Sequence, residues 1–354
     1  MIALNLTLED MINLESITEQ FVEPNRLFYI STKQDFINIP NKYHKYLYIK
    51  YTVYKLDDYV NVKGINVASL VTDISSMNNL EYLCCDFSKI VDVSKHTNLK
   101  HLFCKETKIT NIDTLVNLTS LKCKFSRITS ISTCTNLQIL DCSYTSISNI
   151  DSLVNLISLT CIDTPIKNIS KLQKLKYLDC SKSSIDYVND LLELTELNCR
   201  KTTISLVNNL TNLIRLNCSY SNVRDVNNLV KLEKLKCCGT NIKDLYNLLN
   251  LIELDCSDSA VTDIYMLVNL DLLNIDNTQI SRIDTLVKLS YLSCNNSLVS
   301  DISTLVNLND LHCVHSLIPD TVVAYFHRRR QNEYEYDDDI YDDEYALYTS
   351  TDEE

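Results

Sequence analysis

Residues 137–155, LQILDCSYTSISNIDSLVN, and the block 156–174 that follows, LISLTCIDTPIKNISKLQK, share one pattern of apolar residues. Leucine opens both blocks, and steps of nineteen residues in either direction meet leucine each time, from Leu80 to Leu308. A period that holds over thirteen copies predicts one supersecondary unit, repeated and stacked so that each copy buries its apolar face against its neighbours. The pattern decides the architecture of the chain but does not identify what the chain binds.

Each unit follows the pattern LxxLxCxxTxIxxIxxLxx, counted from the leading leucine as position 1. Position 4 is leucine in all thirteen copies, position 6 is cysteine in every copy except the one with Ile275, and position 9 is always Ser or Thr. Apolar residues at positions 4 and 6, with polar residues between them, have the period of two of a short strand with one buried face. Apolar residues at positions 11, 14 and 17 then favour tight turns or a 3₁₀ segment over a full α-helix.

Two further columns predict how the chain returns to the next strand. Position 15 is Ser, Asp or Asn in ten of the twelve complete copies, which predicts a side-chain acceptor that caps a single helical turn. Asn stands at position 19 in eight of the twelve complete copies and also as Asn79 just before the first copy, and Asn tolerates the left-handed backbone conformation better than most residues. We therefore expect position 19 to end this turn, which explains how a chain with only two glycines turns so often.

The repeated unit resembles the leucine-rich repeat family, whose core motif LxxLxLxxNxL is matched by Leu137, Leu140, Cys142, Thr145 and Ile147. The resemblance implies an α/β-type solenoid, a right-handed horseshoe or arc with a parallel β-sheet on the concave face and short 3₁₀ or single-turn helical segments on the convex face. Two features depart from the family pattern: a hydroxyl stands where an asparagine normally ties adjacent turns together, and the unit is short. The composition also resembles that of leucine-rich repeat proteins of amoeba-infecting giant viruses.

The sequence pattern divides the chain into four predicted parts. Residues 1–79 are interpreted as an N-terminal helix over 7–22, a cap and degenerate repeats, in which Leu47, Ile49 and Thr52 match positions 4, 6 and 9. The alternative is a separate adaptor domain; a helix before repeats resembles F-box-type ubiquitin-ligase adaptors, although residues 1–40 contain no convincing F-box sequence. The solenoid occupies 80–318, a C-terminal cap 319–330, and an acidic tail 331–354.

Charge and hydropathy give an expectation for the location of the protein. The tail has eleven acidic residues and no Lys or Arg, which predicts disorder and accounts for most of the net charge of −13. Acidic residues appear early in the N-terminal segment MIALNLTLED, and no apolar run reaches the length of a membrane span. We therefore expect an intracellular, cytoplasmic protein, in the host cytoplasm if it is viral, with no nucleic-acid or membrane partner and a monomeric state.

The fifteen cysteines are the residues that most suggest chemistry, but their pattern favours a structural role. Twelve lie in the position 6 column, which predicts an inward ladder of small apolar side chains. A disulfide framework needs a different geometry, and a metal site needs thiols that converge, so neither is expected. His312 and His315 beside Cys313 are predicted to point away from that thiol. We expect no catalytic residues, no metal and no cofactor.

The outward strand positions 3, 5, 7 and 8 vary in sequence and are the candidate binding surface. Early copies are basic and aromatic, later copies acidic and polar, and such a face suits a protein partner. The leading interpretation is a non-enzymatic protein–protein interaction scaffold. The alternatives are an adaptor or regulatory subunit whose N-terminal region recruits an enzyme such as a ubiquitin ligase or phosphatase, a plain structural spacer, and an enzyme. A further hypothesis is that the basic copies bind the acidic tail or a similar partner segment. The candidate partner-binding residues are Tyr82, His101, Phe103, Lys105, Lys122, Lys124, Phe125, Tyr144, Tyr177, Arg200, Arg215 and Tyr220.

Overall fold

The computed structural model describes residues 28–30, 47–53 and 61–326, and the chain divides into two units, Met1–Thr203 and Ile204–Glu354. The first unit contains β1 (Phe28–Ile30), β2 (Leu47–Val53), β3 (Gly64–Val67), β4 (Tyr82–Cys84), β5 (His101–Phe103), β6 (Ser120–Lys122), β7 (Ile139–Asp141), β8 (Ser158–Thr160), β9 (Tyr177–Asp179) and β10 (Glu196–Asn198). The second contains β11 (Arg215–Asn217), β12 (Lys234–Lys236), β13 (Glu253–Asp255), β14 (Leu272–Asn274), β15 (Tyr291–Ser293), β16 (Asp310–His312) and a helix over 320–326.

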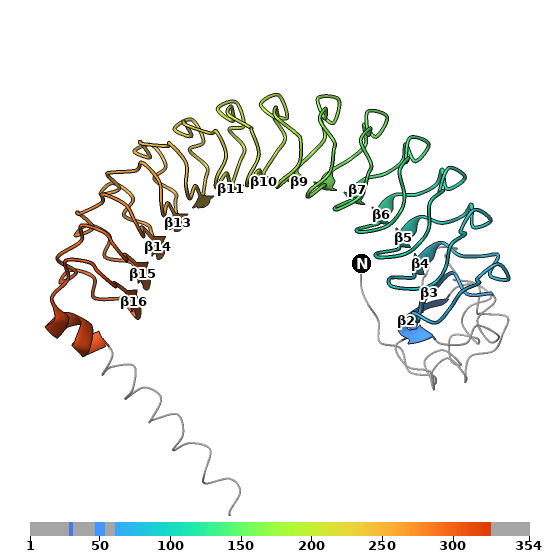
Figure 1. The fold of residues 1–354 in the computed structure, drawn as a ribbon, viewed down its shortest axis with the longest axis horizontal. Coiled ribbons are helices and arrows are strands. Elements are labelled where there is room, and N and C mark those ends of the chain that lie inside the picture. Colours follow the sequence, from blue (N-terminus) through green and yellow to red (C-terminus); the bar gives the residue numbers. More distant parts are fainter. Residues whose placement is uncertain (1–27, 31–46, 54–60, 327–354) are drawn as a thin grey trace, which may run out of the picture. The chain divides into compact units, whose positions relative to one another are not determined.

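Within each unit the strands are parallel and follow one another in chain order, on the concave side (Figure 1). From β4 to β10 and from β11 to β16, each strand covers positions 3 to 5 of its copy and pairs with its neighbour in the same unit at an offset of nineteen residues, as Leu140 pairs with Leu159. The ladder continues past the strand, because the N–H of Cys104 donates to the carbonyl of Lys122 at 2.8 Å. The predicted repeat solenoid with a parallel sheet is therefore confirmed.

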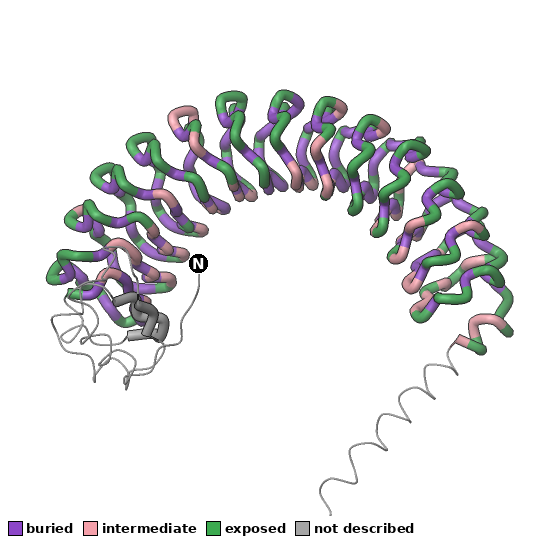
Figure 2. The backbone as a smooth tube through the Cα atoms, turned by 180° about the vertical axis from the view of Figure 1, so that it is seen from behind, coloured by how far each residue is buried: buried purple, intermediate pink, exposed green. Residues whose placement is uncertain are grey.

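The core of each unit is built from the columns that the sequence pattern predicts. Leucines at positions 1 and 4, cysteines at position 6 and apolar residues at 11, 14 and 17 are buried in nearly every described copy. Figure 2 shows this as buried backbone through the interior of each turn and exposed backbone at its outer loop. Ile275, the one exception in the cysteine column, is also fully buried, so the column accepts a larger apolar side chain.

The convex segments consist of single turns. The N–H of Leu115 donates to the carbonyl of Ile112 at 2.9 Å, and the N–H of Leu118 donates to the carbonyl of Leu115 at 3.2 Å. These are i→i+3 hydrogen bonds, the spacing of a 3₁₀ turn. The predicted capping at position 15 was wrong, because the side-chain acceptor lies two residues earlier: Asn111 Oδ1 accepts from the N–H of Asp113 at 2.8 Å, as an Asx-turn does.

The left-handed residue lies at position 8, which corrects the prediction of position 19. All thirteen copies have a positive φ at position 8, with Gly239 the only glycine among them. The asparagines at position 19 instead join adjacent turns through their side chains. Asn155 Nδ2, for example, donates to the carbonyl of Thr135 at 3.2 Å, and the same contact recurs at Asn250, where the distance to the Val230 carbonyl is 2.9 Å.

The hydroxyl at position 9 does not tie adjacent turns together, contrary to the expectation drawn from the family motif. Thr145 Oγ1 donates to the carbonyl of Cys142 in its own turn at 2.6 Å, and Thr202 does the same to Cys199 at 2.7 Å. Backbone hydrogen bonds and the position 19 asparagines join successive turns. The short hydroxyl therefore closes the bend that follows each strand, within a single copy.

The N-terminal copies differ from the regular period. β2 pairs with β3 through a register shift between Tyr48 and Thr52, and Thr52 lies opposite Asn66. Asn66 in turn pairs with Cys84 at position 5, so assigning Thr52 to position 9 was wrong. β1, β2 and β3 extend the sheet of the first unit. The predicted helix over 7–22 and the tail 331–354 lie outside the described residues, and the four domain boundaries stay a prediction.

Candidate partner-binding surface

The first cluster of aromatic side chains lies on β4 and β5. The rings of Tyr82 and Phe103 meet edge to face with centroids 5.4 Å apart, and the Tyr82 and His101 rings lie 6.3 Å apart. Lys122 Nζ, on β6, lies over the Phe103 ring, 5.1 Å from its centroid. Burial and the nearby Lys100 lower the pKa of His101, so its imidazole is neutral at pH 7. This cluster therefore presents aromatic rings beside one ammonium group.

The second cluster follows β6 and β7, where the side chains of position 8 lie side by side. The rings of Phe125 and Tyr144 stack with centroids 4.4 Å apart and an angle of 17° between their planes. Lys124 Nζ lies 5.4 Å from the Phe125 centroid and 5.2 Å from that of Tyr144. An ammonium group over an aromatic face is attracted by the ring quadrupole, so the contacts hold Lys124 at this position.

Phe87 joins these side chains, although the sequence analysis did not select it. Lys105 Nζ lies over the Phe87 ring, 4.7 Å from its centroid, and the ring is 51% exposed. Phe87 occupies position 8, the same position as Phe125 and Tyr144, and this shared position could have identified it as a member of the surface. We use the name Lys–aromatic patch for Tyr82, Phe87, His101, Phe103, Lys105, Lys122, Lys124, Phe125 and Tyr144.

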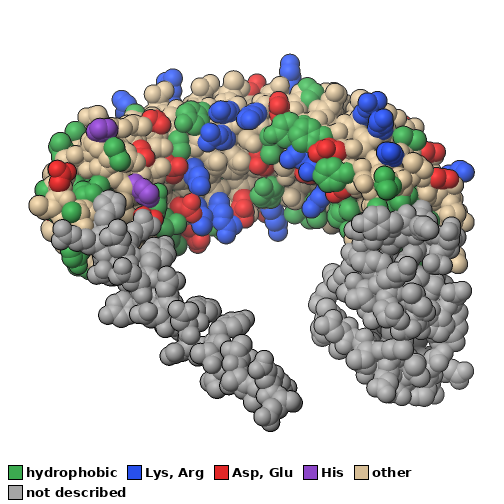
Figure 3. Space-filling model, turned by 60° about the horizontal axis from the view of Figure 1, so that its bottom comes forward, with side chains coloured by type: hydrophobic (Ala, Val, Ile, Leu, Met, Phe, Trp, Pro, Cys, Tyr) green, Lys and Arg blue, Asp and Glu red, His purple; other side chains and the backbone are tan. Residues whose placement is uncertain are grey.

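The charge of the patch is only partly neutralised by its own neighbours. Lys105 Nζ lies 3.8 Å from a carboxylate oxygen of Glu106, which is a long and exposed ion pair. Lys122 and Lys124 form no ion pair with any residue that the structure describes. Lys and Arg side chains lie beside hydrophobic ones on the strand side of the molecule (Figure 3). The patch therefore offers cationic groups and half-exposed rings to an incoming ligand.

The other four candidate residues belong to later copies than the two clusters, and two of them, Tyr177 and Arg200, are in the first unit. Tyr177 on β9 is 37% exposed, and burial followed by the charge of Asp179 raises its pKa. Arg200 follows β10, and its backbone N–H donates to Asn198 Oδ1 at 3.2 Å. These side chains lie on the strand side of the first unit. Their part in binding stays a prediction.

The other two candidates belong to the second unit. Arg215 is exposed on β11, and Tyr220 at position 8 is 46% exposed. The ring of Tyr220 lies against Gly239, because a Cβ placed on that glycine would be 2.6 Å from Tyr220 Cδ1. This glycine therefore fits a position where a neighbouring ring covers the backbone.

The later acidic residues are held by local interactions. Asp255 Oδ1 accepts hydrogen bonds from the N–H and the hydroxyl of Ser257, at 3.3 and 2.8 Å. Glu253 pairs with Lys234 at 2.7 Å and with Lys236 at 3.6 Å, and the Lys234 hydrogen bond is the main reason that its pKa is lowered. These acids satisfy neighbouring donors in the second unit, which makes them weaker candidates for partner binding than the patch lysines.

The cysteine column is a buried ladder of unreactive thiols. Burial raises the pKa of Cys123 and of Cys199 to about 12, so the nucleophilic thiolate is scarce at neutral pH. The cysteines carry no disulfide among the residues described, and no group of three or more metal-binding side chains forms there. Cys238 occupies position 7, one of the positions expected to face outward, but it is only 7% exposed, and its Sγ lies 3.8 Å from the carbonyl oxygen of Asp255.

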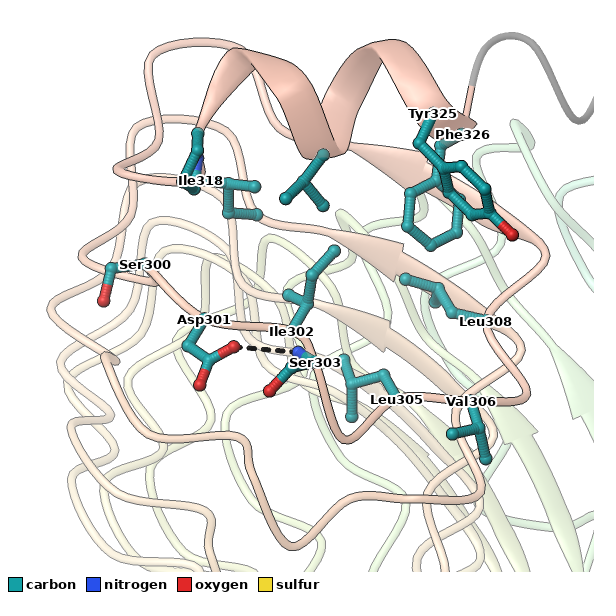
Figure 4. A pocket seen from close by; sticks show the side chains of 12 residues that line it. Ser300, Asp301, Ile302, Ser303, Leu305, Val306, Leu308, Ile318, Tyr325 and Phe326 are labelled. Carbon is teal, nitrogen blue, oxygen red and sulfur yellow. Dashed lines mark hydrogen bonds between the residues drawn. The ribbon is translucent and has the colours of Figure 1, made fainter.

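A cavity of about 450 Å³ lies between the last repeat and the helix over 320–326 (Figure 4). Tyr325 and Phe326 project from the helix toward the last turn, which contributes Leu305 and Leu308. The lining is mainly apolar, and the polar side chain of Asp301 is already used by the N–H of Ser303 at 2.8 Å. The cavity is therefore a packing gap between the helix and the end of the core. Within the described residues, the structure contains no helix with the length and apolarity to cross a bilayer.

Comparisons with known proteins identify the fold. No family model and no curated protein matches this sequence. Among solved structures, the functional domain of InlJ from Listeria monocytogenes, which includes a cysteine ladder, is 26% identical with a TM-score of 0.65, and the match covers 74% of this chain and 64% of that domain. The internalin InlF from the same species is 27% identical with a TM-score of 0.55, over 70% of this chain and 77% of that one.

A leucine-rich repeat protein from Leptospira interrogans has a TM-score of 0.68 at 21% identity, and the match covers 82% of this chain and 90% of that protein. This chain therefore has a leucine-rich repeat fold, a fold that presents extended binding surfaces. It spans less than two thirds of the InlJ domain. The resemblance to giant-virus proteins stays a prediction.

Proposed function

We propose that this protein is a non-enzymatic interaction scaffold that binds a protein partner through the Lys–aromatic patch of its first unit. The observation that carries the proposal is the set of contacts by which Lys105, Lys122 and Lys124 lie over half-exposed rings on the strand side. The likeness to InlJ and InlF supports the same class of function, because the shared fold builds extended interaction surfaces.

Aromatic side chains and cations have complementary roles in such a surface. Rings that are already packed against one another lose little conformational freedom on binding and supply apolar contact area, so they act as anchors. Lysines guide a partner of opposite charge and set its orientation. The stacked Phe125 and Tyr144 rings with Lys124 beside them combine both roles in two adjacent turns.

The proposal is tested by affinity capture from cells of the source organism with three forms of the full chain. These are the natural sequence, the patch variant Lys122→Glu/Lys124→Glu, and the control Lys108→Glu/Lys167→Glu. The control lysines are exposed at positions 10 and 12, outside the strand face, and give the same change in charge. We expect a protein that the natural chain and the control capture and the patch variant loses. Equal capture by all three forms would contradict the proposal.

The alternative function places recruitment in the N-terminal region. In that interpretation residues 1–79 bind an enzyme while the solenoid binds its target, as an adaptor or regulatory subunit does. β1, β2 and β3 belong to this region and pair into the sheet, so a deletion is best limited to residues 1–27, before β1. Loss of one captured protein and retention of another would favour the adaptor.

We also propose an intracellular location, because fifteen cysteines stay reduced in that environment. Cell fractionation tests this location.

A further inference from the structure

Position 8 is a costly place for an aromatic side chain. Phe87, Phe125 and Tyr144 have φ of 61°, 57° and 56°, in the left-handed region that bulky residues rarely adopt. Other copies place Asp163, or later Asn277 and Asn296, at this position, and residues of these types tolerate the conformation better. All thirteen copies have this conformation, Lys182 and Tyr220 among them, so it belongs to the repeat; what is particular to the patch is that three of its position 8 residues are aromatic.

The geometry of the patch specifies the chemistry of that ligand. Lys122 and Lys124 are two residues apart on the same turn, and each lies over a ring from an adjacent turn. Phe87 and Phe125 remain 51% and 45% exposed despite the lysines beside them. A suitable ligand therefore carries several negative charges, to pair with the ammonium groups, and aromatic side chains, to cover the exposed ring faces.

One segment of this chain has that composition. Residues 331–354, QNEYEYDDDIYDDEYALYTSTDEE, contain eleven acidic residues, five tyrosines and no Lys or Arg. Acidic residues and tyrosines alternate through its first half, so carboxylates and rings are available within a few residues of each other. The charge of the segment is opposite to that of Lys105, Lys122 and Lys124, and its tyrosines match the exposed rings.

We propose that the acidic segment 331–354 binds the Lys–aromatic patch, with its carboxylates on the patch lysines and its tyrosines against the rings of position 8. This inference rests on the proposed function of the same surface and names the chemistry that the surface recognises. The segment then competes with any protein partner for the patch, and a partner that displaces it is expected to carry a similar acidic, tyrosine-containing sequence.

The first test measures how well the segment protects the patch lysines in the full chain. Two forms are labelled briefly with an amine-acetylating reagent and analysed by mass spectrometry: the natural sequence, and a form in which the eleven acids of 331–354 are replaced by Asn and Gln. We expect Lys122 and Lys124 to react several-fold faster in the neutralised form. Lys108 and Lys167 are the internal controls and should react equally in both forms. Equal reactivity of the patch lysines in both forms would overturn the inference.

The second test measures binding directly and keeps the full chain. A labelled peptide with the sequence of 331–354 is titrated into the neutralised form, and then into the same form with Lys122→Gln/Lys124→Gln or with Lys108→Gln/Lys167→Gln. We expect the first pair to weaken binding by roughly five- to tenfold, since two exposed cations are removed, and the second pair to leave it unchanged. Equal weakening by both pairs would show attraction to charge in general and would overturn the inference.

The two proposals fail in different ways. If the peptide does not bind but Lys122→Glu/Lys124→Glu still loses a captured protein, the patch binds a partner of other chemistry and only the inference about 331–354 is wrong. If the segment binds and the neutralised form captures more of a patch-dependent protein than the natural chain does, both proposals stand. If the peptide binds and no captured protein depends on the patch, the inference about 331–354 stands and the proposed partner-binding function is wrong.

Discussion

His96 gives a prediction that connects the repeat pattern with the pH dependence of stability. It occupies position 17, a core column that is leucine in most copies, and is only 3% exposed. Its Nδ1–H donates to the carbonyl of Met77 at 3.0 Å, which fixes the tautomer of the neutral ring. Burial lowers the pKa of His96 below 6.5, which outweighs the raising effects of the Met77 hydrogen bond and of the Asp92 and Asp73 carboxylates. The charge of Lys95 also lowers the pKa.

The sign of the effect follows from proton binding. The unfolded chain takes up a proton at His96 at a higher pH than the folded chain does. The free energy of unfolding is therefore highest above pH 6.5 and falls as the pH drops toward and through the lowered pKa. Each unit by which the folded pKa lies below the unfolded one is worth about 1.4 kcal/mol.

The perturbation is His96→Leu, with His96→Met as a matched variant because Met77 occupies the same column. At pH 8 we expect a change within about 1 kcal/mol, since added apolar burial offsets the lost hydrogen bond. Between pH 8 and pH 5 the natural chain should lose about 1 kcal/mol more than either variant. Guanidinium unfolding followed by circular dichroism at both pH values measures the difference. If both variants keep the full pH dependence of the natural chain, the reasoning about His96 is wrong.

Three further substitutions test the local geometry by denaturant unfolding. Gly239→Ala should lower the free energy of unfolding by about 1–2 kcal/mol, because φ is +62° and the new Cβ meets the Tyr220 ring. In a chain that also carries Tyr220→Ala, the same substitution should destabilise less. An equal loss in both backgrounds would refute the ring contact. Cys142→Ser should cost about 1–3 kcal/mol and more than Cys142→Ala, because it buries a hydroxyl in an apolar column; the reverse order would contradict an apolar role. Thr145→Val should cost about 1 kcal/mol and Thr145→Ser less, because only serine keeps the hydroxyl donor; equal costs would argue against the hydrogen bond to Cys142.

The buried columns could be predicted from the sequence because apolar residues at a fixed spacing indicate which positions are buried. Leu140, Cys142 and Ile147 recur at fixed spacing, and only a stacked unit buries all of them at once. Even the exception was informative, since Ile275 is apolar and remains in the core. The strand position and the i→i+3 turns followed from the same periodicities of two and three.

The backbone conformation of the bends could not be predicted in this way. Asn suggested a left-handed residue at position 19, but the hydrogen bonds of the next turn place it at position 8, where Tyr144 donates its N–H to the carbonyl of Ile162 at 2.8 Å. Stacking requires the backbone N–H of position 8 to point toward the next copy, whatever side chain stands at that position. Residue preference is then overridden by the geometry of the neighbouring copy, and the same holds for Asn155, whose side chain joins two turns.

The residue pattern was sufficient to assign the side chains that face the core and the positions left for a partner, because a nineteen-residue period fixes the inward and outward sides of every turn. The folded arrangement was needed to place Lys122 over Phe103, Lys124 beside Phe125 and Tyr144, and the later acids beside their partners. This is because the interactions have a short range. Cation–aromatic attraction and hydrogen bonding act over a few ångströms, and residues nineteen apart in the chain reach that distance only when successive turns stack.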